Sequence, residues 1–202
     1  MTGDGSGPRL HRTTALTTGL KRLLEALERR LEPGLPVTLY LAGGMAVHLY
    51  TGTRVTTDVD AEFDARIAVP NDLVVRVVLE DGEEQTLYFD TGYNPMFSLM
   101  HEAYQDDAIE LDLGLERLRV RVLSPLDLAV SKLARFADND REDVRALVEA
   151  GLVTAAALES RSREALAGFV GGASMVRANV DDAVRNARAI EAGRSDRPGT
   201  KR

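Results

Sequence analysis

The residues with the clearest chemical potential lie close together, in the stretch LAGGMAVHLYTGTRVTTDVDAEF. Gly43 and Gly44 follow an apolar run, and the carboxylates of Asp58 and Asp60 come one short predicted helix later. Glycines between a strand and a helix let a ligand approach backbone N–H groups at the positive end of the helix dipole. The first half of this stretch therefore predicts a phosphate-binding turn.

The two aspartates in the second half are spaced for metal binding. Asp58 and Asp60 are two apart on a predicted strand, so both carboxylates should point to one face while Val59 points into the core. Oxygen ligands without a neighbouring histidine or cysteine suit Mg²⁺ or Mn²⁺, which proteins hold with a few carboxylates and substrate phosphates. Arg54, four residues before Asp58, could neutralise a triphosphate or pair with one of the aspartates. We expect phosphates and a divalent cation to meet in one site.

A strand, a helix and a second strand are needed to position these residues. VTLYLA predicts a short buried strand, GGMAVHLYTG a turn and a helix that ends at Gly52, and DVDAEFDARI another strand. An amphipathic helix precedes this unit and ends at EPGLP. The apolar face of that first helix is formed by Leu20, Leu23, Leu24, Leu27 and Leu31.

The rest of the chain divides into a strand-rich and a helical part. NDLVVRVVLEDG fits a helix or a strand, EQTLYFDTG and DAIELDLGL predict strands, and LRVRVL alternates as an edge strand does. From Ser124 onward, SPLDLAVSKLARF and DREDVRALVEAGL carry helix start and stop signals, and two more helices follow at about 154–168 and 174–192. We expect an α+β fold, with a small mixed β-sheet flanked by helices and a helical C-terminal half.

This order of elements predicts four segments. They are a disordered N-terminus at 1–13, a core at 14–123, a helical C-terminal subdomain at 124–192 and a disordered polar tail at 193–202. The length of 202 residues and the apolar content of 44% are enough to fill a core, so a disordered protein is excluded.

Composition narrows the functional classes. The absence of cysteine excludes disulfides, thiolate zinc sites and cysteine nucleophiles. No segment approaches the roughly 20 apolar residues of a membrane helix, and the N-terminus lacks the apolar core of a signal peptide, so we expect a cytoplasmic protein without a membrane partner. The net charge of -7 disfavours broad nonspecific nucleic-acid binding, although a local basic face can coexist with it.

The two glycines, followed after about a dozen residues by Asp-x-Asp between hydrophobic positions, resemble the signature of the DNA polymerase beta-like nucleotidyltransferase superfamily. RVTTDVD, together with the later SPLDLAVSKLARFADNDREDV, is more narrowly similar to the AbiE-type toxin and related minimal nucleotidyltransferases of toxin–antitoxin and defence systems. The resemblance covers roughly residues 39–147. One departure is Met45, where many relatives carry a small polar residue that helps to hold phosphate.

The resemblance implies roles for particular residues within a nucleotidyltransferase core. It puts the phosphate turn at Gly43 and Gly44, the metal pair at Asp58 and Asp60, and a helical lysine at Lys132. The lysine lies at the margin of an apolar helical stripe, so its ammonium could reach into a cleft and bind the triphosphate. An ordinary surface lysine is the alternative.

A third carboxylate in this superfamily comes from a neighbouring strand. AIELDLG offers Glu110 and Asp112, again two apart on one face, and we prefer Asp112 as the residue that completes the metal shell or activates the acceptor hydroxyl. The polar face of an amphipathic strand would explain both carboxylates equally well. Asp140 and Asp143 could orient Lys132 or the nucleotide, but they also suit helix capping, and we favour that role for at least one of them.

The reaction that the resemblance implies is a metal-dependent transfer of a nucleoside monophosphate from a nucleoside triphosphate to an acceptor hydroxyl, with release of pyrophosphate. Similarity to the toxins suggests the 3′ end of tRNA as acceptor and a cognate antitoxin as partner. A small molecule, as in aminoglycoside nucleotidyltransferases, a protein side chain, or a catalytically inactive nucleotide-binding module are the alternatives. A phosphate-binding face, or simply a solvated helix surface, could be formed by Arg161, Arg163, Arg177, Arg185 and Arg188.

Overall fold

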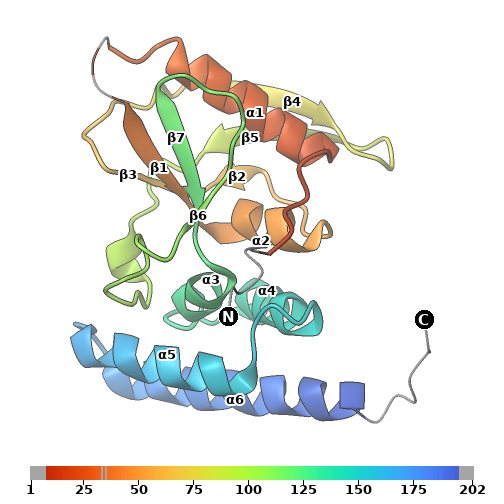
Figure 1. Cartoon of the computed structure of the whole chain (residues 1–202), viewed down its shortest axis with the longest axis vertical. Helices are drawn as coiled ribbons and strands as arrows, with labels where there is room; N and C mark the ends of the chain where they lie inside the picture. Colours follow the sequence, from red (N-terminus) through yellow and green to blue (C-terminus); the bar gives the residue numbers. More distant parts are fainter. Residues whose placement is uncertain (1–7, 33, 35, 196–202) are drawn as a thin grey trace, which may run out of the picture. The chain divides into compact units, whose positions relative to one another are not determined.

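The computed structural model describes residues 8–32, 34 and 36–195 of the chain (Figure 1). The chain forms two compact units. The first comprises the chain up to Asn94 together with Gln105–Ser124, and the second comprises Pro95–Tyr104 together with the chain from Pro125 onward. Of the two ends expected to be disordered, residues 1–7 and 196–202 lie outside the described part.

The first unit carries the strands. Its helices are α1 (Ala15–Glu28) and α2 (Gly43–Thr51). Its strands are β1 (Val37–Leu41), β2 (Asp58–Val59), β3 (Ala61–Phe63), β4 (Val74–Val78), β5 (Glu84–Phe89), β6 (Ile109–Glu110) and β7 (Leu118–Val122).

These strands form two small sheets. One has the order β3-β1-β7-β6 and the other β2-β5-β4. In the first sheet β1 and β7 run parallel, while β3 and β6 pair antiparallel on their outer sides. Leu39 and Leu41 of β1 are fully buried, as are their partners Val120 and Val122 of β7. Apolar residues at every second position therefore set the register of the two central strands.

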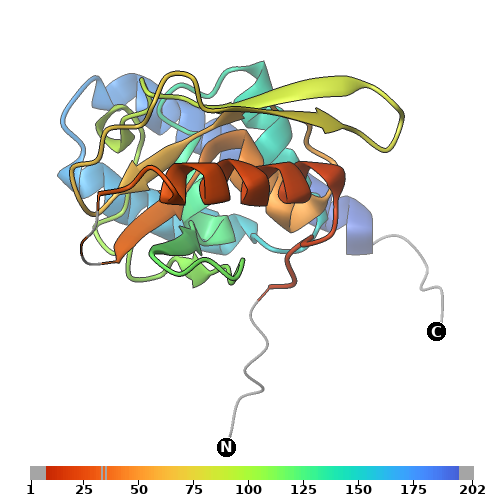
Figure 2. The same cartoon turned by 90° about the horizontal axis from the view of Figure 1, so that it is seen from above.

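Helix α1 packs against the second sheet, on β4 and β5 (Figure 2). Its N-cap is Thr14, whose side chain accepts the backbone N–H of Thr17. At the contact, Gly19 lies so close to the sheet that a Cβ there would come within 2.3 Å of Cγ2 of Val77. The buried leucines of α1 include Leu20, Leu23, Leu24 and Leu27, as their spacing predicted, whereas Leu31 lies beyond the end of the helix and is half-buried.

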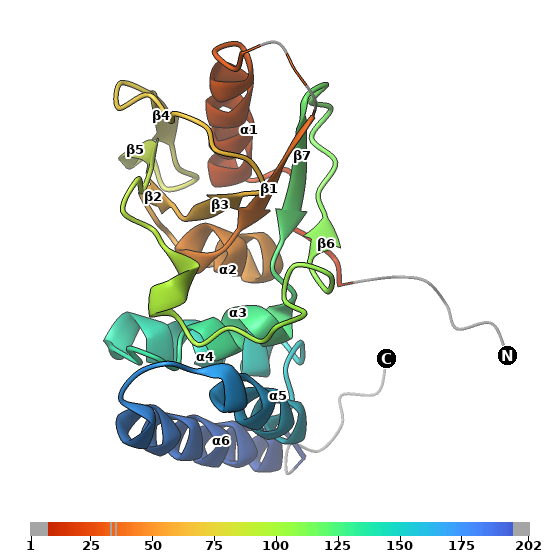
Figure 3. The same cartoon turned by 90° about the vertical axis from the view of Figure 1, so that its left-hand side faces the viewer.

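The second unit is helical. It contains the 3-10 turn η1 (Pro95–Phe97) and the helices α3 (Pro125–Ser131), α4 (Asp138–Glu149), α5 (Ala155–Gly168) and α6 (Ala173–Ser195). Helices α5 and α6 lie side by side (Figure 3), and α4 packs on α6. Helix α3 is joined to α5 by a buried ion pair, in which Nε of Arg161 lies 2.8 Å from Oδ1 of Asp127. In the part of the chain that the structure describes, every helix is too short or too polar to cross a bilayer.

The expected α+β class with a helical C-terminal half is confirmed, but two strand assignments differ and one that was open is now decided. DVDAEFDARI forms two short strands in different sheets, because the chain leaves β2 at Asp60 and joins β1 as β3. LRVRVL is β7, which lies inside its sheet between β1 and the two-residue β6, and is not an edge. The segment NDLVVRVVLEDG, left open between helix and strand, forms β4.

His48 of α2 ties α1 to the loop that precedes β2. Its Nδ1 donates to the backbone carbonyl of Arg54 at 2.7 Å, and in the neutral imidazole its Nε2, 2.7 Å from Oγ1 of Thr14, accepts from that hydroxyl. The neutral imidazole satisfies both contacts. Burial accordingly lowers the pKa of His48, although the hydrogen bond to Arg54 acts in the opposite direction.

A depressed histidine pKa makes stability depend on pH. Unfolded His48 binds a proton near pH 6.5, whereas folded His48 binds it only at lower pH. The stabilisation is complete above the unfolded pKa and declines as the pH falls from about 7 towards the folded pKa. We expect urea midpoints to fall between pH 7 and pH 5, and to fall less steeply in His48→Gln, which cannot titrate. Equal pH dependence in the two proteins would contradict a neutral His48.

Candidate functional site

The predicted phosphate turn lies where β1 passes into α2. Gly43 is the first residue of α2 and has a φ of +60°, in the left-handed region that favours glycine. The N–H of Ala42, just before it, donates to the carbonyl of Asp60 at 3.0 Å. The backbone of the glycine turn is therefore joined directly to the Asp-x-Asp segment.

Gly43 leaves room for the carboxylate of Asp60. A Cβ at Gly43 would lie only 1.6 Å from Oδ2 of Asp60, so any other residue would have to displace that side chain. The carboxylate thus lies against the N-terminal residue of α2, where the helix dipole favours a negative charge. The missing side chain of Gly43 serves an intramolecular contact, in addition to any ligand that approaches the turn.

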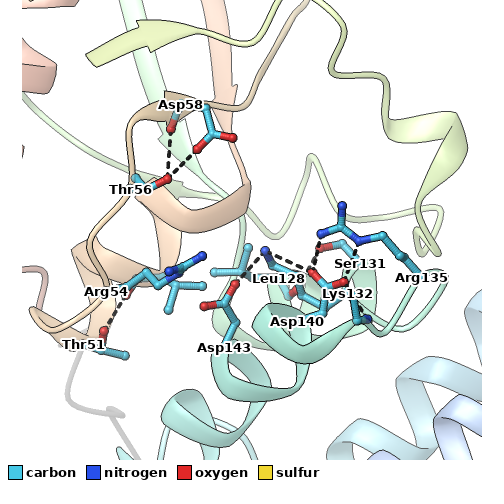
Figure 4. Close-up of polar contacts among 12 residues, drawn as sticks. Thr51, Arg54, Thr56, Asp58, Leu128, Ser131, Lys132, Arg135, Asp140 and Asp143 are labelled. Atoms are coloured by element: carbon cyan, nitrogen blue, oxygen red, sulfur yellow. Dashed lines mark hydrogen bonds and ion pairs between the residues drawn. The ribbon is translucent and has the colours of Figure 1, made fainter. Parts of the chain in front are cut away.

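Gly44 makes the equivalent space for Thr56. A Cβ at Gly44 would come within 2.9 Å of Oγ1 of Thr56, which is buried. The same hydroxyl donates a hydrogen bond of 2.5 Å to Oδ1 of Asp58 (Figure 4). A short bond to a charged acceptor holds the carboxylate in one orientation. Each glycine is therefore coupled to one of the two aspartates, Gly43 to Asp60 and Gly44 through Thr56 to Asp58.

The aspartates flank the point where the chain changes sheets. Asp58 pairs with Tyr88 of β5, and Val59 with Phe89, whereas Ala61 pairs with Leu41 of β1. Val59 is fully buried, as expected, and both aspartates are half-buried. Two half-buried carboxylates separated by one residue are thus held by a sheet switch rather than by one regular strand.

Arg54 lies on the loop that leads into this segment. Its carbonyl accepts from His48, and its Nη1 donates to the carbonyl of Val55 at 3.1 Å. The side chain is half-buried. The loop is therefore fixed at its backbone by the buried histidine of α2.

The structure does not bring Asp112 to Asp58 and Asp60. Both Glu110 and Asp112 are exposed, and Oδ1 of Asp112 accepts the N–H of Gly114 at 2.9 Å, as in an Asx turn. In sheet order β1 and β7 separate β6 from β3. Among the described residues, no group of three or more histidine, cysteine, aspartate or glutamate side chains is arranged to hold a metal ion.

Asp90 is a carboxylate near the pair that the sequence analysis missed. It directly follows β5, and its N–H donates to the carbonyl of Val59 at 3.1 Å. The last paired residues of β2 and β5 are Val59 and Phe89. Extending this parallel register by one residue puts Asp90 level with Asp60. Asp90 is exposed, like Asp112, and its Oδ1 likewise accepts the N–H two residues on, that of Gly92 at 2.8 Å, so strand pairing is what distinguishes the two. In the sequence, Asp90 is recognisable only as an aspartate that follows the apolar strand TLYF. The pairing of β5 with β2 is needed to show that it lies level with Asp60.

In the second unit, Lys132 lies between two buried carboxylates. It directly follows the last residue of α3, and its N–H still donates to the carbonyl of Ala129 at 3.3 Å, in the turn that closes the helix. Its Nζ is 2.8 Å from Oδ2 of Asp143 and 3.7 Å from Oδ1 of Asp140 (Figure 4). Asp140 and Asp143 are 2% and 1% exposed. The lysine thus neutralises a buried acidic pair, and its contact with a triphosphate stays a prediction.

Asp140 has the structural role that its position suggested. It accepts the N–H of Ala137 at 3.0 Å at the start of α4, and its two oxygens lie 2.8 and 3.0 Å from Nε and Nη2 of Arg135. Burial by itself would raise the pKa of Asp140, but the hydrogen bond from Arg135 and the charge of Lys132 hold it below its usual range.

The arginines proposed for a phosphate-binding face are mostly engaged with acids of the helical unit. Arg161 pairs with buried Asp127, Arg163 and Arg188 with Glu159, and Arg185 with Asp182. A cavity of about 320 Å³ on α5 and α6 is lined by Arg163 and Arg177, together with Asp181. Because its partner Asp127 is buried, Arg161 belongs to the core of this unit.

Lys132→Met should destabilise the protein by about 3 kcal/mol, because it removes the cation that lies 2.8 Å from the buried carboxylate of Asp143. Arg185→Gln is the matched control: its side chain is 71% exposed, its partner Asp182 is 30% exposed, and such surface pairs contribute about 1 kcal/mol or less. Urea unfolding at pH 7 measures both. A loss in Lys132→Met no greater than that in Arg185→Gln would show that the lysine is not needed for folding.

Comparison with known proteins adds one finding. The sequence profile of a family described as nucleotidyltransferases of unknown function (DUF6036) matches residues 18–180. That range contains the glycine turn, the Asp-x-Asp segment, Asp90 and the Lys132 cluster. No curated protein matches the chain.

Proposed function

The chain belongs to this family of nucleotidyltransferases, and from that premise we propose that it transfers a nucleoside monophosphate from a nucleoside triphosphate to an acceptor hydroxyl at Asp58 and Asp60. The observation that carries the proposal is the packing of Gly43 against Asp60 and of Gly44 against Thr56. It holds two half-buried carboxylates beside the N-terminus of α2, where backbone N–H groups attract phosphate.

The donors at this site fit Mg²⁺ or Mn²⁺. Asp58 and Asp60 offer carboxylate oxygens, and Mg²⁺ in nucleotide enzymes is often held by one or two carboxylates with the substrate phosphates as further ligands. When bound, such a cation would neutralise phosphate charge and favour ionisation of the acceptor hydroxyl.

The residues of the chain would orient the reactants. Thr56 fixes one carboxylate by its 2.5 Å hydrogen bond to Asp58, and the space at Gly43 holds the other. In the transfer, the acceptor oxygen bonds to the α-phosphorus and pyrophosphate leaves with the electron pair of the broken P–O bond. We assign Asp90, rather than Asp112, as the carboxylate that takes the hydroxyl proton, since strand pairing puts it level with Asp60. Arg54 would neutralise triphosphate charge.

For the acceptor we propose the 3′ end of tRNA, in the manner of a toxin restrained by a cognate antitoxin. The resemblance of the Asp-x-Asp segment to toxin enzymes supports this, and so do Arg163 and Arg177 at the cavity on α5 and α6. The ion pairs of Arg163, Arg185 and Arg188 weaken it, because they offset charge that RNA would need. A small molecule or a protein hydroxyl is the alternative acceptor.

Asp60→Asn should strongly reduce transfer and leave the fold intact. Asparagine keeps the size that the space at Gly43 admits but removes a negative charge, so the transfer rate should fall by about 100-fold or more. Calorimetry with a nonhydrolysable triphosphate should show cation-dependent binding that Asp60→Asn weakens. Unaltered transfer by Asp60→Asn would show that the two aspartates are only the solvated end of a strand.

Asp81→Asn is the matched control for that experiment. Asp81 is exposed in the β4–β5 turn, where its Oδ1 accepts the N–H of Glu83, and asparagine suits the same turn. It should bind and transfer as the parent does. In the same assay, Asp90→Asn should lose more activity than Asp112→Asn. The reverse order would restore Asp112 as the third carboxylate.

The acceptor can be identified by following the label of α-labelled nucleoside triphosphates. With Mg²⁺ and bulk tRNA, we expect label at RNA 3′ ends, and expression in a bacterial host should slow growth unless Asp60 is replaced by Asn. Label in total protein or in a small molecule would identify a different acceptor for the same transfer reaction. Binding without transfer to any acceptor would indicate a catalytically inactive nucleotide-binding module.

A further inference from the structure

We infer that the pocket at the end of β4 and β5 binds a nucleobase, either that of the incoming nucleoside triphosphate or that of a nucleotide acceptor. The inference rests on the function proposed above, because the pocket borders the carboxylates of that site. It assigns residues that the reaction itself does not use, and it concerns the specificity of the enzyme.

Strand register puts the pocket next to Asp58. Tyr88 of β5 pairs with Asp58 on one side and with Val74 of β4 on the other. Paired residues in a sheet share a face, so these three side chains form one row across the sheet. The neighbouring row, Val59 and Phe89, is buried.

The face that carries this row is open. Tyr88, on the central strand of this sheet, is 43% exposed, and Val74, on the edge strand β4, is 56% exposed. Beside them lies a cavity of about 270 Å³, lined among others by Leu73, Val74, Tyr88, Asn71, Asp90 and Thr91. This volume is below the roughly 300–1,000 Å³ of pockets for drug-sized ligands, so it suits one ring system rather than a whole nucleotide.

The lining has the chemistry of base recognition. An exposed tyrosine ring offers a surface on which any base can stack, and Leu73 and Val74 provide apolar contact. Asn71 adds an amide with both donors and an acceptor, and Thr91 adds a hydroxyl, which are the groups that bind the polar edge of a base. No lysine or arginine lines the described pocket, so its lining offers no side-chain cation for a phosphate.

The position of the carboxylates relative to the pocket determines how a bound nucleotide would be oriented. Asp90 lies at the pocket and level with Asp60, and Asp58 lies one strand from Tyr88. A nucleotide with its phosphates at Asp58 and Asp60 can therefore extend its base along the row towards Tyr88 and Val74. The base and the phosphates would be held by different elements of one unit.

The test compares Tyr88→Ser with Tyr88→Phe, which keeps the ring, and with Val78→Ser. Val78 is 61% exposed on the same face of β4 and lies outside the pocket, so it controls for loss of exposed apolar surface. Dissociation constants are measured with Mg²⁺ for each nucleoside triphosphate, for inorganic tripolyphosphate and for a short oligoribonucleotide. Tyr88→Ser should weaken binding of a base-containing ligand by about tenfold, while tripolyphosphate binding, Tyr88→Phe and Val78→Ser stay near the parent values.

The ligands separate the two sources of the base. Weaker binding of nucleoside triphosphates assigns the pocket to the incoming nucleotide, and weaker binding of the oligoribonucleotide alone assigns it to the acceptor. If Tyr88→Ser binds every base-containing ligand as the parent does, while tripolyphosphate still needs Mg²⁺ and Asp60, the pocket inference is wrong and the proposed function stands. If tripolyphosphate binding depends on neither Mg²⁺ nor Asp60, the proposed function fails and the inference falls with it.

Discussion

The absence of a side chain at Gly43 is the constraint on which the candidate site depends. A carboxylate oxygen of Asp60 lies 1.6 Å from the place that a Cβ would take, so the end of β1 and the Asp-x-Asp segment can approach only if this residue is glycine. The positive φ of Gly43 has the same requirement. Gly44 likewise leaves space for the side chain of Thr56, whose hydroxyl donates to Asp58. Two glycines thus hold two negative charges beside one helix N-terminus.

The chain also changes sheets at Asp60, between β2 and β3. Because the chain leaves β2 there, β2 is free to pair with β5, while β3 pairs with β1. That pairing carries Asp90 to the level of Asp60 and puts Tyr88 beside Asp58. The carboxylates and the open aromatic face therefore arise from the same backbone arrangement.

The helical unit handles buried charge in a different way. Asp140 and Asp143 are almost fully buried, and Lys132 lies within ion-pair distance of both. Loss of Lys132 would remove the cation beside the buried carboxylate of Asp143, which costs stability in a medium of low dielectric. Asp58 and Asp60, in contrast, are half-buried, so their charge remains accessible to a ligand. Acidic residues that look alike in the sequence therefore differ in burial and in ion pairing between the two units.

The sequence by itself determined the α+β class, the strand–helix pair that carries the glycines and the identity of the Asp-x-Asp pair, since these depend on local periodicity and on conformations that only glycine adopts easily. It pointed to Asp112 rather than Asp90 as a third carboxylate, and to a helical Lys132. Only the tertiary structure shows that Asp90 is level with Asp60 and that Lys132 lies between two buried acids, because the pairing of β2 with β5 and the ion pairs of Lys132 join residues far apart in the chain. Local patterns do not encode which strands become neighbours, and the neighbours decide which polar side chains can act together.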